Sequence, residues 1–236
     1  MLRLAALSTL LLACDLGSPD RYERLTVAAA DLHTLSILSD AGDITIEGDP
    51  DAVDVSIVAG IHGEYTKLTH TRVGNTLELT HQCSSRGDCG VDWRIVAPVE
   101  LAAQLETDAG DIRISGLNGA LRANTDAGDI DLADLDAPSI DVETGSGDIT
   151  GQNLHCEKFR GETGLGDLGL DLRARPRSVW WSSGAGDINL TVPGGPYKLD
   201  LETGLGDIDL AGIRRDDAAD ATLHLHTGSG DIDVAG

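Results

Sequence analysis

Through most of its length the chain alternates apolar and polar residues in short runs that are separated by turns. Leu121, Ala123 and Thr125 alternate with polar residues, and Ile130 and Leu132 resume the alternation after a turn. A period of two is typical of a strand with one buried face, whereas a helix repeats its apolar positions every three or four residues. The pattern therefore predicts an all-β chain of many short strands.

A six-residue motif marks a turn in each of eight such units. It reads Ser or Thr, Asp or Gly, any residue, Gly, Asp, and Ile or Leu. From Asp111 to Asp207 its Asp recurs every 18–20 residues, and Asp231 follows after 24. This period accommodates two strands and two turns, which predicts a β-solenoid because one unit alone cannot bury its apolar face. The repeated Asp residues are Asp43, Asp111, Asp129, Asp148, Asp167, Asp187, Asp207 and Asp231.

Three positions of the motif have predicted roles in the turn. The second position is Asp or Gly, which tolerate a positive φ, so we expect a left-handed backbone there. The Ser/Thr falls at the same alternate positions as the inward aliphatic residues, so its side chain is expected to point inward. Its hydroxyl is expected to form a hydrogen bond with a turn amide. The repeated Asp is expected to accept amides of its own turn. The alternative, calcium ions between the coils, is disfavoured because one carboxylate per coil supplies few oxygen ligands.

Residues 1–14 have the features of a bacterial secretory signal, with one positive charge, an apolar run and a small residue before Cys14. The apolar run is too short to span a bilayer. Leu11-Leu12-Ala13-Cys14 also resembles the lipobox of bacterial lipoproteins, which implies that Cys14 becomes the lipidated first residue. The alternative is an ordinary signal that happens to contain a cysteine. Residues 15–24 are expected to form a polar tether.

Repeated Gly-Asp-Ile coils behind an export signal resemble the putative adhesin family of bacterial envelope proteins, a domain of unknown function. The resemblance covers residues 25–236, and the eightfold motif that carries it is specific. It implies a β-solenoid fold and a location in the cell envelope. It implies no catalytic residues.

The chain is expected to divide into four segments. The signal (1–14) and the tether (15–24) precede an irregular β region at 25–106, which contains the first repeat. This region is expected to cap the solenoid, since terminal repeats differ from internal ones. Regular coils occupy 107–236, and the last of them has no covering element after it, so we expect an open edge there.

Composition and charge agree with a thin, acidic solenoid. Only 3% of residues are aromatic and 29 are Gly, which suits a narrow core of aliphatic side chains between two facing sheets. The formal net charge is -23, so nucleic acid and anionic lipid headgroups are excluded as partners of the surface.

The four cysteines are expected to have three different chemical states. Cys14 is assigned to the lipid, and Cys83 and Cys89 are expected to form a disulfide in an oxidising envelope. Cys156 is left over and is expected to be a buried thiol, with an intermolecular link as the alternative. The loop between the paired cysteines contains Arg86-Gly87-Asp88, an integrin-type tripeptide that we interpret as a polar hairpin tip.

Several weaker patterns predict no site. Gly164–Gly169 matches the dinucleotide-binding fingerprint, but a strand rather than a helix is expected after it. His224 and His226 share an outward face without a third metal ligand, and His155-Cys156 is equally incomplete. Of the pair Trp180-Trp181 one side chain should point outward, and it is the only sign of a sugar-stacking surface.

The sequence therefore predicts a non-catalytic envelope lipoprotein on the periplasmic face or outer surface of a membrane. Its expected role is an adhesin-like binding or spacer module with an unknown protein or glycan partner, held by the Cys14 lipid anchor. No cofactor, metal or catalytic residue is predicted. Two other functions stay open: an envelope sensor or regulatory partner, and a polysaccharide-active β-helix enzyme, which would need a groove with clustered acids.

Overall fold

A computed structural model describes residues 19–63, 66–84 and 89–236, so Cys14 and the tripeptide 86–88 lie outside the described residues. The described ranges form strands and turns, and they contain no helix long and apolar enough to cross a membrane. The strands are β1 (Arg21–Ala28), β2 (Thr34–Ser39), β3 (Ile44–Asp49), β4 (Asp54–His62), β5 (Thr66–Val73), β6 (Thr76–Cys83), β7 (Gly90–Pro98), β8 (Ala102–Ala109), β9 (Ile112–Ser115), β10 (Leu121–Ala127), β11 (Ile130–Ala133), β12 (Asp136–Ser146), β13 (Ile149–Leu165), β14 (Leu168–Leu172), β15 (Ser178–Ala185), β16 (Ile188–Thr191), β17 (Gly195–Thr203), β18 (Ile208–Ala211), β19 (Ile213–Arg215), β20 (Thr222–Thr227) and β21 (Ile232–Ala235).

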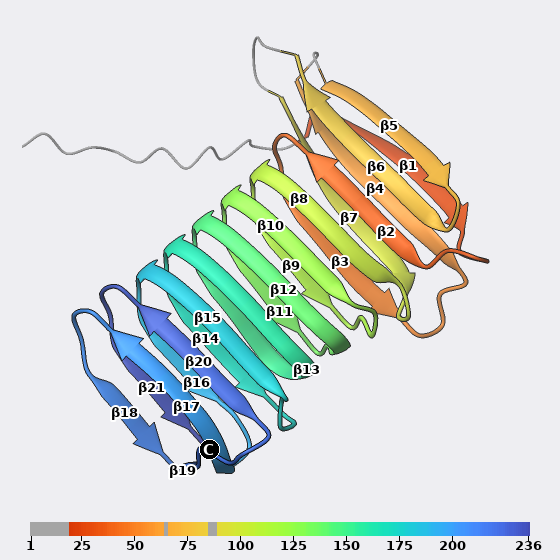
Figure 1. Ribbon diagram of the computed structural model, residues 1–236. Helices are drawn as coiled ribbons and strands as arrows, with labels where there is room; N and C mark the ends of the chain where they lie inside the picture. Colours follow the sequence, from red (N-terminus) through yellow and green to blue (C-terminus); the bar gives the residue numbers. More distant parts are fainter. Residues whose placement is uncertain (1–18, 64–65, 85–88) are drawn as a thin grey trace, which may run out of the picture.

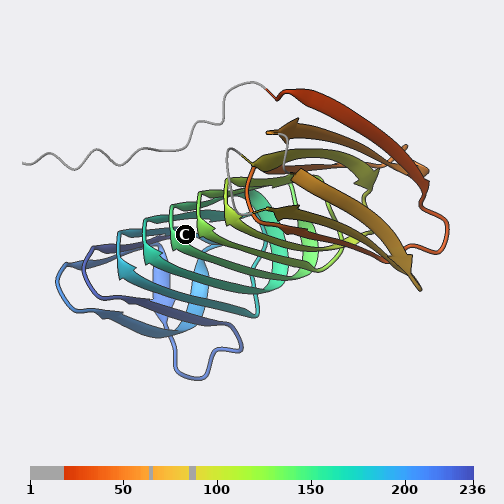
Figure 2. The ribbon, with the colours of Figure 1, turned by 90° about the horizontal axis from the view of Figure 1, so that it is seen from above.

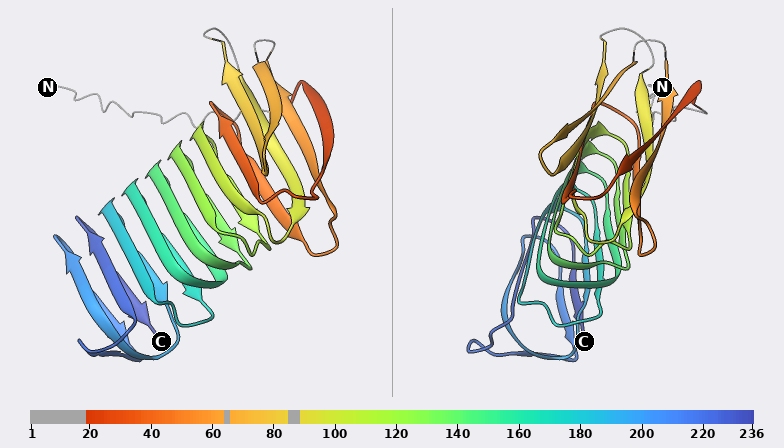
Figure 3. Two further views of the ribbon diagram at one scale, coloured as in Figure 1. Left: turned by 45° about the vertical axis from the view of Figure 1, so that its right-hand side comes forward. Right: turned by 90° about the vertical axis from the view of Figure 1, so that its right-hand side faces the viewer.

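The strands wind into a β-solenoid, which confirms the predicted fold. Each coil gives one strand to each of two facing sheets, and neighbouring coils pair in parallel (Figures 1 and 3). The long strand β13 runs from one sheet into the other and pairs on both. Sheet A runs β1-β4-β7-β3-β9-β11-β13-β14-β16-β21-β18, and sheet B runs β5-β6-β2-β8-β10-β12-β13-β15-β20-β17.

The core consists of stacks of equivalent side chains, because the coils are in register. The Ile/Leu that ends each motif points inward, and burying such a side chain stabilises the fold by about 1.5–3 kcal/mol. In seven consecutive coils this residue has 0% exposure: Ile44, Ile112, Ile130, Ile149, Leu168, Ile188 and Ile232.

The few large aromatic residues are accommodated individually. Trp181 is fully buried and Trp180 is half-buried on the outer side of sheet B, as the alternation predicts. Trp181 lies against Gly161 of the neighbouring strand, where a Cβ atom would overlap the indole ring. The absence of a side chain at Gly161 therefore makes room for the bulky Trp181 in a narrow core.

At both ends the order of the coils in space differs from their order in the chain. The coil β2–β3 lies between β6–β7 and β8–β9, and the final coil β20–β21 lies between β15–β16 and β17–β18. The expectation of an open edge at the final coil is therefore wrong. The open end is the coil of β17 and β18 (Figure 1). In this coil Ile208 and Leu210 are 40% and 43% exposed.

The N-terminal end is extended by antiparallel strands. Beyond the first coil, sheet A continues with β4 and β1, and sheet B continues with β5. Seen from above, these strands form a separate layered end on the solenoid (Figure 2). Such pairing ends the stack without offering a further parallel coil edge.

The left-handed position of the turn is not the predicted one. The second-position glycines such as Gly145 do not have a positive φ, whereas the Gly directly before each repeated Asp does, with φ between 110° and 155°. At Gly147 an added Cβ would lie 2.1 Å from the carbonyl oxygen of Gly128 in the neighbouring coil. The fourth motif position is therefore Gly for two reasons, its backbone conformation and the close approach of adjacent turns.

Replacing this glycine should destabilise the fold where a neutral glycine replacement does not. Gly147→Ala should lower the free energy of unfolding by about 1–3 kcal/mol or more, through backbone strain and overlap with Gly128. Gly169→Ala is the matched control, because Gly169 lies in β14 with no atom within 4 Å of an added Cβ. Urea unfolding measures both, and equal stabilities would contradict this assignment.

Candidate functional site

The repeated Asp residues form one continuous ladder along the turn edge of the solenoid. The Oδ1 atom of each Asp except the last accepts the backbone N–H of the Asp in the next coil, at 2.7–3.2 Å. The ladder links the coils across the rearranged ends as well. Its order is Asp92, Asp43, Asp111, Asp129, Asp148, Asp167, Asp187, Asp231 and Asp207.

This geometry corrects one detail of the predicted turn. The carboxylate was expected to accept amides within its own turn, but it joins neighbouring coils instead. A hydrogen bond from N–H to a carboxylate disperses its charge, which offsets the repulsion between stacked carboxylates. Arg113 adds a positive charge, with its guanidinium 2.7 Å from Asp111, 3.4 Å from Asp131 and 3.6 Å from Asp43.

The Ser/Thr of the motif forms a second ladder just inside the first. These side chains point inward, as predicted, and all are buried except Thr203 of the terminal coil, which is partly exposed. Their hydroxyls do not accept a turn amide, however: Thr144 donates to the carbonyl of Gly128 at 2.9 Å, and Thr163 donates to Gly147 at 3.1 Å. The hydroxyl therefore donates to the carbonyl of the positive-φ glycine in the neighbouring coil.

Asp92 and His62 are residues of this edge that the sequence pattern does not reveal. Asp92 follows Gly90-Val91 outside the motif, yet it occupies the first rung of the ladder. The Nε2 atom of buried His62 lies 3.0 Å from Asp92 Oδ2. Only the in-register pairing of β3 with β7 places Asp92 beside Asp43.

The most distinctive outer surface is the cluster Arg160, Trp180, His224 and Asp200, one residue from each of four adjacent strands of sheet B. The Arg160 guanidinium lies 4.2 Å from the centre of the Trp180 ring, and His224 stacks on the ring at 5.9 Å. Asp200 accepts a hydrogen bond from His224 Nδ1 at 2.8 Å. Cation–π and ring contacts with neighbours on both sides hold Trp180 in place, which leaves little ring face for a sugar to stack on.

The histidines that the sequence places in pairs contact carboxylates of neighbouring strands. His224 and His226 each pair with a carboxylate of β17, Asp200 and Glu202. His155 points outward to Asp136 at 2.7 Å, whereas Cys156 is buried on the opposite face of its strand. Burial raises the pKa of the Cys156 thiol to about 11, so this thiol is protonated and unreactive at neutral pH, in agreement with its expected burial.

The disulfide between Cys83 and Cys89 is present, which confirms the predicted pair. Together with His81 these sulfurs form the only group of three or more His, Cys, Asp or Glu ligand atoms within metal-binding distance in the part of the chain described. The Gly164–Gly169 fingerprint runs from β13 into β14, without the helix that a nucleotide site needs.

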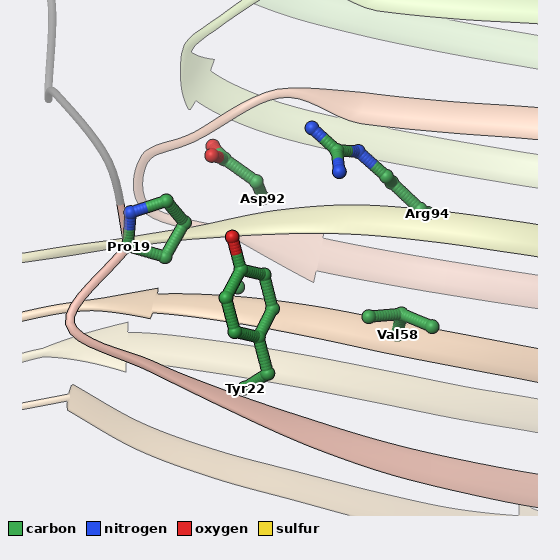
Figure 4. Close-up of a pocket in the computed structure, with 6 residues that line it drawn as sticks. Pro19, Tyr22, Val58, Asp92 and Arg94 are labelled. Carbon is green, nitrogen blue, oxygen red and sulfur yellow. The ribbon is translucent and has the colours of Figure 1, made fainter.

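Two depressions on the described part of the surface are shallow or very small. One, shown in Figure 4, is lined by Pro19, Tyr22, Asp92 and Arg94, and its volume of about 10 Å³ suits one water molecule. The other has a volume of about 340 Å³ on the outer side of sheet A, and its lining contains no His, Cys or Lys. Neither resembles the concave, apolar pocket of a small-molecule site.

Comparison with known proteins identifies the family. A sequence profile for Toastrack DUF4097 matches residues 24–235. The chain belongs to the Toastrack DUF4097 family. This confirms the resemblance to a domain of unknown function with repeated coils. No curated protein sequence matches this Toastrack chain.

Solved structures share the Toastrack fold at low sequence identity. A protein from Bacteroides fragilis NCTC 9343, described as a putative adhesin, has a TM-score of 0.57 at 18% identity, and the match covers 91% of this chain and 97% of that one. Another protein with that description, from Parabacteroides distasonis ATCC 8503, has a TM-score of 0.51 at 11% identity, with 90% and 97% covered. At these identities the likeness shows the fold alone.

If the Asp ladder is a hydrogen-bonded staple, the Toastrack chain should not need calcium. With the disulfide intact, the thermal midpoint in excess chelator should stay within a few degrees of its value in calcium, because backbone amides already occupy the Oδ1 atoms. Magnesium serves as the control cation. A fall of about 15 °C or more, reversed by calcium but not by magnesium, would show that the ladder is a metal site.

Proposed function

We propose that this chain is a non-catalytic module of the bacterial cell envelope, lipidated at Cys14, which binds a protein partner through the outer face of sheet B. The observation that carries the proposal is the cluster around Trp180. Trp and Arg dominate the binding energy of protein interfaces, above all when they are held rigidly before binding. The description of the two solved structures as putative adhesins agrees with a binding role.

The solenoid is well suited to present such a surface. Its coils are linked by backbone pairing in both sheets and by the Asp ladder at one edge, so the faces are continuous. A protein partner is favoured over a glycan, because Arg160 and His224 already pack against the Trp180 ring. A catalytic role is disfavoured, because neither depression is lined by His or Cys, and the Thr150 hydroxyl that donates to Asp131 at 2.6 Å lies on an exposed, shallow face.

The Trp180 surface can be tested by pull-down from an envelope extract of the source bacterium, followed by affinity measurement on the partner retained. Trp180→Ala should weaken binding by about 30-fold, the effect of losing a hot-spot residue worth about 2 kcal/mol. Thr222→Ala is the control, since Thr222 lies on the same outer face in β20. Equal affinity for the two variants, or hydrolysis of an envelope polysaccharide by the wild-type chain, would refute the proposal.

The lipid anchor has a separate test. Cys14→Ser should move the protein from the membrane fraction to the soluble fraction when it is expressed in a diderm host, because the variant has no thiol to acylate. Unchanged fractionation of a Cys156→Ser variant would control for the loss of a cysteine. Retention of Cys14→Ser in detergent-extractable membranes would mean that Cys14 is not the anchor.

A further inference from the structure

A histidine replaces the Ser/Thr of the repeat in the first coil of the solenoid. In the register of sheet B, His81 of β6 lies beside Ser39, which in turn lies beside Thr107. The His81 side chain has 0% exposure and points inward as the hydroxyl residues do. It therefore brings an imidazole to the edge of the core, next to the sulfurs of Cys83 and Cys89.

The hydrogen bonds of His81 determine which ring nitrogen carries the proton. The Ser39 hydroxyl donates to the carbonyl of Ala41 at 3.2 Å, so its oxygen is free to accept from His81 Nδ1 at 3.0 Å. A neutral imidazole that donates through Nδ1 has an unprotonated Nε2, which is the form that binds metals.

That Nε2 lone pair is directed at two sulfur atoms. Nε2 lies 3.4 Å from Cys89 Sγ and 3.7 Å from Cys83 Sγ. Thr66 is similar: its hydroxyl donates to the carbonyl of His62 at 2.7 Å, so its oxygen presents a lone pair to Cys89 Sγ at 3.6 Å. A disulfide has no proton to offer these acceptors, whereas a pair of thiols or a bound cation would satisfy them.

The spacing also suits a tetrahedral metal ion. With Zn–S near 2.3 Å and Zn–N near 2.0–2.1 Å, tetrahedral S and N ligands lie about 3.6 Å apart. The two N···S distances, 3.4 and 3.7 Å, bracket that value. The ligand atoms of all three residues lie within 4.8 Å of one another, and the cysteines are only half-buried, so an ion can reach them.

We propose that His81, Cys83 and Cys89 form a redox-gated site for a thiophilic divalent cation such as Zn²⁺, closed while the disulfide is intact and open once it is reduced. A dithiol reductant supplies the two electrons. Its thiolate attacks one cysteine sulfur, which forms a mixed disulfide and releases the other cysteine as a thiolate; its second thiolate then attacks the reductant's own sulfur in the mixed disulfide, which releases the first cysteine, and the reductant leaves as a cyclic disulfide. The Cys83–Cys89 bond is broken, and two thiols are formed. Zn²⁺ binding then releases their two protons, and a water molecule completes four-coordination.

The test uses the purified full chain and Zn²⁺ alone, in the disulfide form and after reduction with a phosphine and anaerobic desalting. Elemental analysis after equilibrium dialysis should find one more zinc per chain in the reduced form. A double Cys83→Ser, Cys89→Ser variant measures the zinc held by the acidic surface. Co²⁺ in place of Zn²⁺ should give thiolate charge-transfer and tetrahedral absorption bands in the reduced form only.

The decisive variant is His81→Thr, which restores the residue type of the other coils and retains both cysteines. It should fold as the wild type does, with a similar thermal midpoint in the disulfide form, and its reduced form should bind zinc at least 10–100-fold more weakly. Equal zinc uptake by the reduced wild type and the Cys83→Ser, Cys89→Ser variant would overturn the proposal. So would an unchanged zinc affinity in His81→Thr, or a cobalt spectrum without thiolate bands.

Discussion

The close stacking of turns along one edge is the constraint on which the rest of this solenoid depends. Each turn brings a glycine carbonyl within reach of the next coil, and no Cβ fits there. The same approach allows the carboxylate of one Asp to accept the amide of the next. The turn therefore requires glycine, aspartate and the buried hydroxyl residue together. The stacking of this edge also determines the register of both sheets.

The ladder also accounts for the rearranged ends. Every coil presents the same acceptors on one side and the same donors on the other, so any coil can lie beside any other. The final coil can therefore enter between β15–β16 and β17–β18, where its Asp231 donates to Asp187 and accepts from Asp207. The charged segment that includes β19 supplies the length needed to pass over the terminal coil.

The sequence predicts the coil and the inward positions, because alternation and a fixed period are local properties of the chain. It predicts the disulfide from two cysteines close together in the sequence behind an export signal. It does not predict which coils are neighbours, because the edges of all coils are alike and do not specify a particular partner. For the same reason it misses Asp92, which joins the ladder through the pairing of β7 with β3. The turn is misassigned at three positions. Composition alone does not show which glycine has a positive φ, and it does not distinguish a hydrogen bond within a turn from one between coils. His81 lies outside the repeated motif. Its contact with the sulfurs depends on its position in β6, where the alternation of side chains directs it inward.

The most direct measurement of the central claim is the free energy of unfolding of ladder variants in urea. Asp148→Ala removes the acceptor for Asp167 N–H and should cost about 1–2 kcal/mol, whereas Asp148→Asn retains an acceptor oxygen and should lose less than half of that. Asp171→Ala, at an exposed outward carboxylate of β14, should change stability by less than about 0.5 kcal/mol. If Asp148→Ala proves as neutral as Asp171→Ala, the carboxylate ladder does not hold the coils together.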